Sequence, residues 1–373
     1  MSMFASTSSR VSLSGTRVRL PRRRVSRAVS ASPASALLGV RSKSKAPSAP
    51  AKPPAGTPAD AAAFKAAGAA LALPALPAFV ATEPILEAFG VSHSDPAAFA
   101  GISDIAHYSN VVGTDCFALI ALCATYVLSD AAENARLDSA TYQRLALALV
   151  LYAAATSAGV LAAFAVGTAS DLGPAPSPAA VLGVVAALSP AAAVSASAIS
   201  KYGGGFGTAF DRAKEDVGVV LALNEASEKG GYLERYYKLS FWASMIVGGA
   251  FAFSPLSPLA IVNEFTPSSQ FLQRAFGLGT VFMLAPAQFV LLDAASRGRL
   301  GGGTFKKLNL SVAAAIAGID AMTVYTFAAA TALNPDADAL AGASGGIYNY
   351  VGALAVSFSI LAVYLYQGIF AKK

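Results

Sequence analysis

Eight apolar segments follow one another along this chain, and they constrain its fold more than any other feature. They fall at about 62–82, 113–129, 145–168, 180–200, 237–257, 276–292, 308–332 and 347–370. A helix needs about 20 such residues to cross the apolar core of a bilayer. The second and sixth segments are short for that length. We therefore predict an all-α integral membrane protein with about eight transmembrane helices.

The composition supports this class. Charged residues make up 13% of the 373 residues, hydrophobic residues 55%, and the mean hydropathy is +0.55. Soluble domains carry about 25% charged residues. The low charge excludes disorder for the bulk of the chain and disfavours an ordinary soluble enzyme. The expected partner is a lipid bilayer.

The first 55 residues differ from the rest and are predicted to be a targeting leader with a Pro/Ala linker. Residues 1–51 hold ten Lys/Arg, 13 Ser and no Asp or Glu. This composition is typical of an organelle transit peptide, and its uncharged, Ser/Thr-rich start favours a chloroplast. The remaining chain has 17 basic and 21 acidic residues, a net charge of −4, so no nucleic-acid partner is expected.

The basic residues test the count of eight spans. With eight spans, the two termini and the loops after spans two, four and six share one side of the membrane. From residue 52 onward that side holds 16 of the 17 Lys/Arg, and Arg274 is the exception. Loops rich in Lys/Arg stay on the side from which a protein is inserted. We expect both termini in the stroma, with the protein in the inner envelope or the thylakoid.

The chain also contains an internal repeat. Residues 127–145 read VLSDAAENARLDSATYQRL and residues 290–308 read VLLDAASRGRLGGGTFKKL, with nine of 19 positions identical at an offset of 163. The repeat predicts two four-span units, 56–200 and 237–373, joined by a stromal amphipathic linker at 201–236. Four spans is an even number, so the units insert the same way round and form a parallel repeat.

Two equivalent hinges, each joining the second and third span of its unit, are the best preserved part of the repeat. Their residues are Asp130, Arg136 and Thr141 in the first unit, and Asp293, Arg299 and Thr304 in the second. We favour a structural role, in which an Asp–Arg pair locks the turn and the Thr caps the next helix. The alternative is that the two arginines bind an anion at the mouth of a pore.

Polar residues inside the spans are the candidate transport site, because such residues are costly in a bilayer and usually functional. Asp320 is the acid predicted at mid-span, and its repeat partner is Ser157. Gln288 follows Pro286 in the sixth span, and its partner is Thr125. Paired short or broken spans are a further sequence indication of a transport site. The alternative for Asp320 is a packing role.

Metal, cofactor and catalytic sites are not expected. His93, Asp95, Asp104 and His107 are the only weak metal candidates, and we expect them in a solvated acidic loop. Cys116 and Cys123 lie seven residues apart and are expected to pack as small apolar side chains. No Ser/His/Asp pattern indicates an enzyme.

Two functions fit these observations. The first is a permease of a chloroplast membrane for a small solute or ion, which the repeat, the paired short spans and Asp320 favour. The second is a non-catalytic scaffold or assembly factor that binds subunits of a photosynthetic thylakoid complex. Spans rich in small residues favour this alternative, because such spans pack closely against other helices.

Overall fold

The described structure, a computed structural model, covers residues 55–78, 82–90, 102–170, 173–221, 231–253, 266–333 and 346–372. All of them belong to one compact unit of the chain, Pro53–Lys373. The predicted leader and linker, apart from Ala55, lie outside the described residues. Helices dominate the described part, where the only β contact is an isolated bridge between Ala55 and Arg136.

Eight long helical segments account for the bundle. They are α1 (Pro58–Ala78), α3 (Ile102–Glu133), α4 (Ala140–Ala169), α5 (Pro178–Tyr202), α7 (Gly231–Phe253), the continuous run α8–η2–α9 (Pro267–Gly279, Thr280–Leu284, Ala285–Ser296), α10 (Gly303–Leu333) and α12 (Gly346–Phe370). The short α2 (Thr82–Ala88) follows α1, and α6 (Gly205–Leu221) joins α5 to α7.

Each of the eight predicted segments falls on one of these long helices. Six of them are long and apolar enough to cross a membrane, namely α1, α3, α4, α5, α8–η2–α9 and α10. The described apolar part of α12, Leu354–Phe370, is shorter, and α7 is not among the six. Glu234, Arg235 and Lys238 lie near the start of α7 and lower its hydropathy. The chain is thus an all-α polytopic membrane protein.

Local sequence signals fix several helix starts. Before α1, the Thr57 hydroxyl accepts from the Asp60 N–H at 3.2 Å and the Asp60 carboxylate accepts from the Thr57 N–H at 3.1 Å. Thr266 and Ser269 form the same reciprocal box before α8. A proline follows both capping threonines, where a missing N–H costs nothing. The Asp60 carboxylate also accepts from the Tyr202 hydroxyl at 2.7 Å, which ties the start of α1 to the end of α5.

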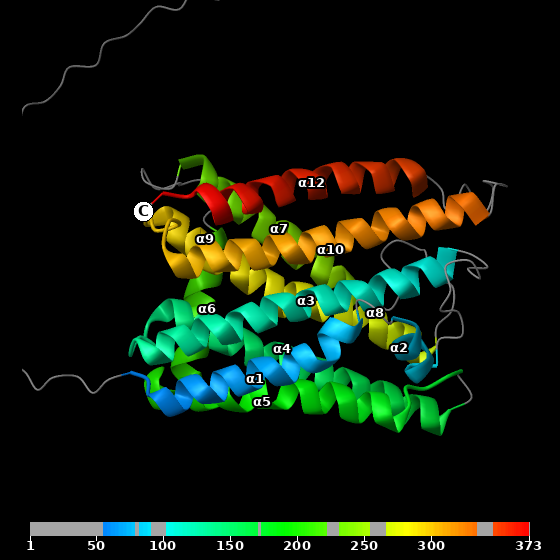
Figure 1. Ribbon diagram of the computed structural model, residues 1–373, viewed down its shortest axis with the longest axis horizontal. Helices are drawn as coiled ribbons and strands as arrows, with labels where there is room; N and C mark the ends of the chain where they lie inside the picture. Colours follow the sequence, from blue (N-terminus) through cyan, green and yellow to red (C-terminus); the bar gives the residue numbers. More distant parts are fainter. Residues whose placement is uncertain are drawn as a thin grey trace, which may run out of the picture. The chain divides into compact units, whose positions relative to one another are not determined.

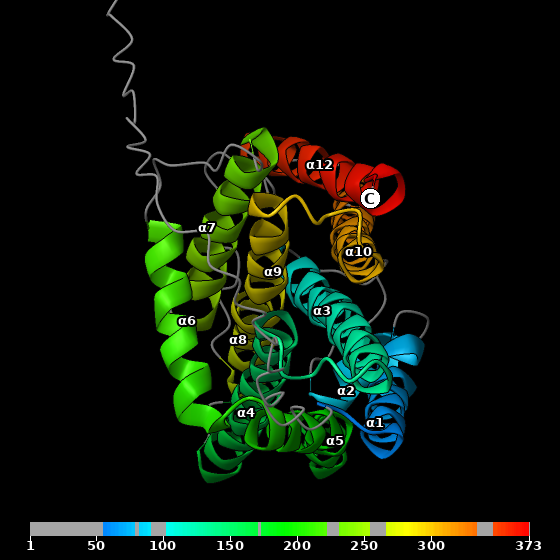
Figure 2. The same cartoon turned by 90° about the vertical axis from the view of Figure 1, so that its left-hand side faces the viewer.

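The long helices pack into one bundle around α3, α4 and α8 (Figures 1 and 2). α3 lies against α1 on one side and α10 on the other, while α4 lies against α5 and α8. α12 packs against α10, and α7 packs against α8 and α9. The resulting core includes Phe64, Phe117, Leu145 and Leu291, all almost fully buried.

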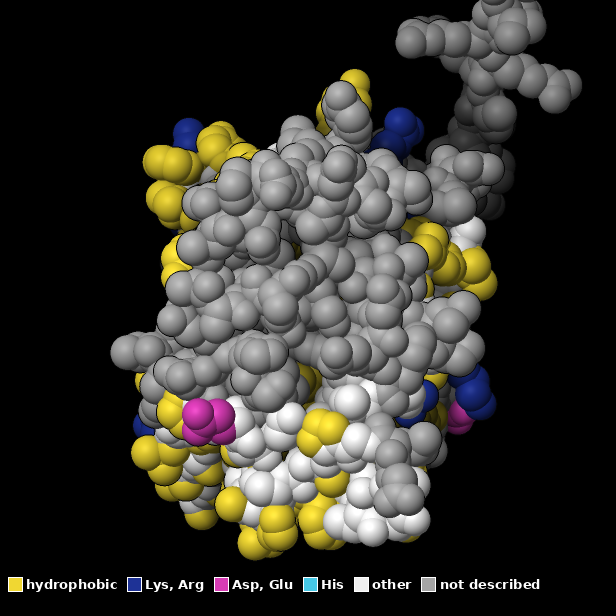
Figure 3. Space-filling view, turned by 90° about the vertical axis from the view of Figure 1, so that its right-hand side faces the viewer, with side chains coloured by type: hydrophobic (Ala, Val, Ile, Leu, Met, Phe, Trp, Pro, Cys, Tyr) yellow, Lys and Arg dark blue, Asp and Glu magenta, His cyan; other side chains and the backbone are white. Residues whose placement is uncertain are grey.

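One end of the bundle collects the start of α1, the α3–α4 turn, the α9–α10 turn and the end of α12 (Figure 1). We call it the hinge end. The Leu137 N–H donates to the Ala55 carbonyl at 2.9 Å, and the Lys306 ammonium donates to the Ile369 carbonyl at 3.2 Å. In the described part of the opposite end, hydrophobic side chains alternate with backbone and uncharged polar side chains, and few charged side chains are visible (Figure 3).

α6 runs along one side of the bundle near the hinge end, transverse to α3 and α10 (Figure 2). The sequence predicted an amphipathic linker at 201–236, and α6 (Gly205–Leu221) lies within it; residues 222–230 lie outside the described part. Val220 is buried, whereas Phe210, Val217 and Leu221 are at least 43% exposed. This orientation is typical of a helix that lies on a membrane surface.

The second and sixth spans are not short, so this part of the sequence interpretation was wrong. The apolar part of α3, Val112–Glu133, has 22 residues, and the run α8–η2–α9 extends from Pro267 to Ser296, 30 residues. The hydropathy pattern ended at polar residues such as Ser268, Ser269 and Gln273, but these are buried and continue the helix. Paired short spans therefore no longer support a transport function.

The sixth span is instead irregular in its middle. Residues Thr280–Leu284 form a π turn, closed by the Ala285 N–H on the Thr280 carbonyl. Pro286 follows two residues after this turn, and in a regular helix its ring would collide with the Phe282 carbonyl. The wider π turn accommodates it. Such turns often mark functional positions in helices.

Candidate functional site

The two hinge turns have the same backbone structure. The Arg136 N–H donates to the Ala131 carbonyl and the Arg299 N–H to the Ala294 carbonyl, both at 2.8 Å. Four further backbone hydrogen bonds also recur at the offset of 163. In the first hinge the N–H donors are Ala135, Ser139, Tyr142 and Gln143. In the second hinge the equivalent donors are Gly298, Gly302, Phe305 and Lys306. The sequence likeness of the two hinges therefore corresponds to a likeness of structure.

The side chains of the two hinges are paired differently. Arg136 lies 3.5 Å from Asp130, both half-exposed, as the predicted Asp–Arg pair requires. Arg299 has no ion-pair partner among the described residues. Asp293 pairs instead with Arg297 at 2.6 Å and with Arg144 of α4 at 3.5 Å.

The threonines of the hinges do not cap the helices, which corrects the role assigned from the sequence. The N-cap of α4 is Ser139, whose side chain makes no capping hydrogen bond, and Thr141 lies inside the helix. Thr304 likewise lies inside α10. Its hydroxyl is 3.3 Å from the Tyr142 hydroxyl, so it joins the two hinges to each other.

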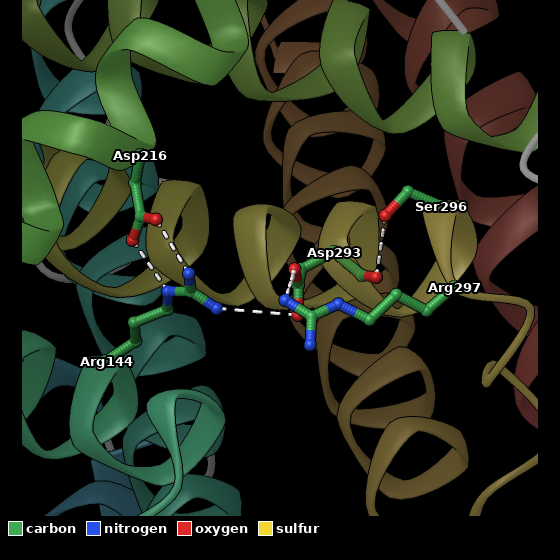
Figure 4. A network of polar contacts seen from close by, with 5 residues as sticks. All are labelled: Arg144, Asp216, Asp293, Ser296 and Arg297. Atoms are coloured by element: carbon green, nitrogen blue, oxygen red, sulfur yellow. Dashed lines mark hydrogen bonds and ion pairs between the residues drawn. The ribbon is translucent and has the colours of Figure 1, made fainter. Parts of the chain in front are cut away.

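A network of ion pairs next to the hinges connects α4, α6 and α9 (Figure 4). Arg144 donates twice to Asp216 of α6, at 2.6 and 2.7 Å, and its third nitrogen faces Asp293. The Arg144 and Asp216 side chains are 17% and 16% exposed. The network holds α6 against α4 and α9. Sequence reasoning missed it because its members lie far apart along the chain.

Reciprocal cation–π contacts link the two predicted repeat units. The Arg144 guanidinium lies 4.9 Å from the centre of the Phe289 ring, and the Lys307 ammonium lies 4.5 Å from the centre of the Tyr126 ring. Arg144 and Lys307 are 163 residues apart, and so are Tyr126 and Phe289. Each unit therefore places a cation on a ring of the other.

A cavity of about 500 Å³ opens between the two hinges. We call it the hinge pocket. Its lining includes three pairs of equivalent residues: Arg136 and Arg299, Thr141 and Thr304, and Tyr142 and Phe305. The glycines at 301–303 complete the wall on the α10 side.

Asp320 lies in the middle of α10 and is 3% exposed. The Ser357 hydroxyl of α12 hydrogen-bonds with its carboxylate, while the Oδ2 atom is buried with no partner among the described residues. Its repeat partner Ser157 is half-buried on α4.

Asp115 is a second acid inside the membrane bundle, and the sequence analysis did not single it out. The apolar segment was taken to start at 113, which placed Asp115 at its edge. Because α3 begins at Ile102, Asp115 lies near mid-helix instead. Its Oδ2 is buried without a hydrogen-bond partner, close to the buried Tyr152 of α4.

The two carboxylates lie at the same depth. α3 and α10 touch where Cys116 Sγ fills the space beside Gly318. The helices are antiparallel, since Cys123 Sγ reaches the Lys307 carbonyl near the start of α10. Asp115 is one residue from Cys116 and Asp320 two residues from Gly318, so both lie within about 3 Å of this contact along the helix axes.

Gln288 belongs to a different polar cluster. It donates to the Ser240 hydroxyl at 2.8 Å, and Ser240 contacts the Tyr364 hydroxyl at 3.1 Å. Tyr237 beside them donates to Asn309 at 2.7 Å. Asn309 is 11 residues before Asp320 on α10, about 16 Å along the axis. No hydrogen bond joins Gln288 to Asp320 among the described residues.

Thr125 occupies the place equivalent to Gln288. It faces Gly68 of α1, as Gln288 faces Ser240 of α7, and its hydroxyl donates to the Leu122 carbonyl at 2.7 Å. Thr125 and Gln288 are both buried. The structure thus places these two partners in corresponding surroundings, but neither beside Asp320.

The metal candidates are not assembled in the described part of the chain. His93 and Asp95 lie outside the described residues. Asp104 and His107 belong to α3, because that helix begins at Ile102, so they are not in the loop expected from the sequence. No group of three potential metal ligands occurs among the described residues.

The chain matches no protein family model, no curated protein and no solved structure. The fold therefore defines the class, a polytopic α-helical membrane protein. The two carboxylates at one depth within the bundle define the candidate site.

Proposed function

We propose that this protein is a permease of a chloroplast membrane that couples the movement of a small solute or ion to protons or cations. The observation that carries the proposal is the position of Asp115 and Asp320. Both lie near the middle of long helices, at one depth, with a carboxylate oxygen that has no partner among the described residues. Buried acidic residues inside membrane spans commonly mark proton relays and ion pathways.

The cost of burying a charge in a membrane supports a role of the two carboxylates in binding a proton or cation. A charged aspartate at the centre of a bilayer costs about 2.5–3.5 kcal/mol on insertion scales. A proton removes the charge and a bound cation compensates it, so either would stabilise the buried state. Release of that proton or cation requires access to water. A protein whose site opens in turn to the two sides of the membrane would therefore carry the proton or cation across.

The proposed architecture is two parallel four-span units, which gives eight spans. The matching hydrogen bonds of the hinge turns and the reciprocal cation–π contacts support it. Asp115 belongs to the first unit and Asp320 to the second, and both lie next to the α3–α10 contact between the units. Rocking of one unit against the other would change the surroundings of both carboxylates, as in other transporters built from repeats.

The proposed location is the inner envelope or the thylakoid membrane, with the hinge end and both termini in the stroma. The Arg- and Ser-rich leader supports the chloroplast, and the Lys/Arg of the hinge end support the orientation. The proposal assigns the protein no catalysis and no cofactor.

Transport in liposomes tests the proposal. The full chain would be reconstituted with a trapped pH-sensitive dye, and a gradient of Na⁺ or K⁺ would be applied. We expect proton exchange, with Asp115→Asn and Asp320→Asn each lowering its rate at least tenfold. Asp211→Asn is the matched control, because this α6 side chain is 73% exposed. Its rate should stay within about twofold of the wild type, since an exposed charge carries no such cost.

Two outcomes would contradict the proposal. Unchanged exchange in both aspartate variants would remove the carboxylates from the mechanism. An inactive wild-type protein that co-migrates with a photosynthetic complex on a native gel would instead favour the scaffold function.

A further inference from the structure

The hinge pocket has the electrostatic character of an anion site. Its lining carries the guanidinium groups of Arg136 and Arg299 and contains no Asp or Glu. Arg299 has no ion-pair partner among the described residues. The Arg136 guanidinium lies 3.5 Å from Asp130, with both side chains half-exposed, and 5.9 Å from the centre of the Tyr142 ring. An exposed pair of this kind is weak, so Arg136 is available to a stronger acceptor.

Two helix N-termini face the same pocket. α4 starts at Ala140 and α10 at Gly303, and the first residues of both helices line the cavity. Free N–H groups and the helix dipole favour an anion at such a position. The start of α4 is open to a ligand, because its N-cap Ser139 makes no side-chain capping bond.

The hydroxyl groups add donors on one side of the pocket. Tyr142 and Thr304 contact each other at 3.3 Å. The equivalent contact would join Phe305 to Thr141, but phenylalanine has no hydroxyl. Thr141 also lines the pocket, and its hydroxyl lacks this contact to the other hinge.

We propose that the hinge pocket binds a phosphate-type oxyanion, held by Arg136 of one unit and Arg299 of the other. Arginine forks match the oxygens of phosphate, and the helix N-termini supply backbone donors. The pocket lies at the end of the spans, where a soluble phosphate compound and a phospholipid headgroup both have access. The inference does not depend on the transport proposal.

Binding to the full chain tests the inference in two arms. In the first arm, inorganic phosphate is titrated calorimetrically into the protein in phosphatidylcholine nanodiscs. In the second arm, thermal unfolding is compared between nanodiscs of phosphatidylglycerol and of phosphatidylcholine. Binding in the first arm identifies a soluble ligand, and stabilisation in the second alone identifies a lipid headgroup.

The variants decide whether the pocket is responsible. The double variant R136Q/R299Q should weaken phosphate binding at least tenfold or abolish the lipid effect. Lys214→Gln removes a charge from α6, where the side chain is 80% exposed, and should change neither. Thermal unfolding of each variant confirms that it is folded.

The inference is overturned if neither arm shows an effect, or if the double variant and Lys214→Gln behave alike. Transport measurements do not enter this decision. The variant D115N/D320N should still bind phosphate in the same nanodiscs, so failure of the transport proposal and failure of this one are distinguishable.

Discussion

Ala135 and Gly298 adopt the same left-handed backbone conformation, with φ values of 52° and 65°, at equivalent places in the two hinge turns. Left-handed backbone is strained for a residue with a β-carbon and free of strain for glycine. The second hinge therefore has the favourable residue, Gly298, and the first hinge has the unfavourable one, Ala135.

This difference predicts that substitutions at the two positions have different effects on stability. Gly298→Ala should lower the free energy of unfolding by about 1 kcal/mol, because it adds a β-carbon to a left-handed residue. Ala135→Gly should cause no loss of stability, since strain relief offsets the added freedom of the unfolded chain. Thermal unfolding in one detergent measures both. A larger loss for Ala135→Gly would contradict the backbone assignment.

Helix packing at the α7–α8 contact predicts a second pair of effects. A methyl group on Gly277 would collide with the backbone nitrogen of Ala252, whereas one on Gly249 would meet open space. Overpacking of this kind costs about 1–3 kcal/mol when backbone must move. Gly277→Ala should therefore unfold at a lower temperature than the wild type. Gly249→Ala, the control, should not.

The ion pair between Arg144 and Asp216 should stabilise the position of α6. Asp216→Asn leaves a largely buried guanidinium without its bidentate partner, so we expect a loss of about 2 kcal/mol in unfolding free energy. Lys214→Gln, in the exposed pair with Asp211, should cost less than about 0.5 kcal/mol. Proteolysis within α6 should become faster in Asp216→Asn alone. Equal proteolysis of the two variants would show that the pair does not hold the helix.

The orientation of the hinge end can be tested by labelling. Ser139 is exposed in the α3–α4 turn, and Lys372 follows the last helix at the same end. Cysteines placed at these two positions should react with an impermeant reagent from one side of the membrane, the stroma. Labelling of the two positions from opposite sides would exclude the eight-span arrangement.

The sequence predicted the long helices well because apolarity is a local property. It misjudged the second and sixth spans because helix length there depends on packing. Ser268, Ser269 and Gln273 are polar in sequence but buried in the bundle, and the helix continues through them. Asp115 was missed because it lies near the start of the apolar part of α3, Val112–Glu133, although the helix itself begins at Ile102.

Long-range partners could not be predicted from spacing. Arg144 and Asp216 are 72 residues apart, and no local pattern connects them. The pairing of Asp293 with Arg297 and Arg144, in place of Arg299, likewise depends on how α4 meets α9. The repeat did predict that the two hinges correspond, but it could not predict that they face each other across a cavity.

The reciprocal contacts of Arg144 with Phe289 and of Lys307 with Tyr126 have the form of an interface between identical subunits, where every contact occurs twice. Under the proposed duplication, a four-span homodimer would carry each acidic residue in two copies. Joining the halves into one chain removes that constraint. Asp115 corresponds to Leu278 and Asp320 to Ser157, so each carboxylate is present once. The fused chain keeps a symmetric frame, while its two buried carboxylates are free to differ in their surroundings.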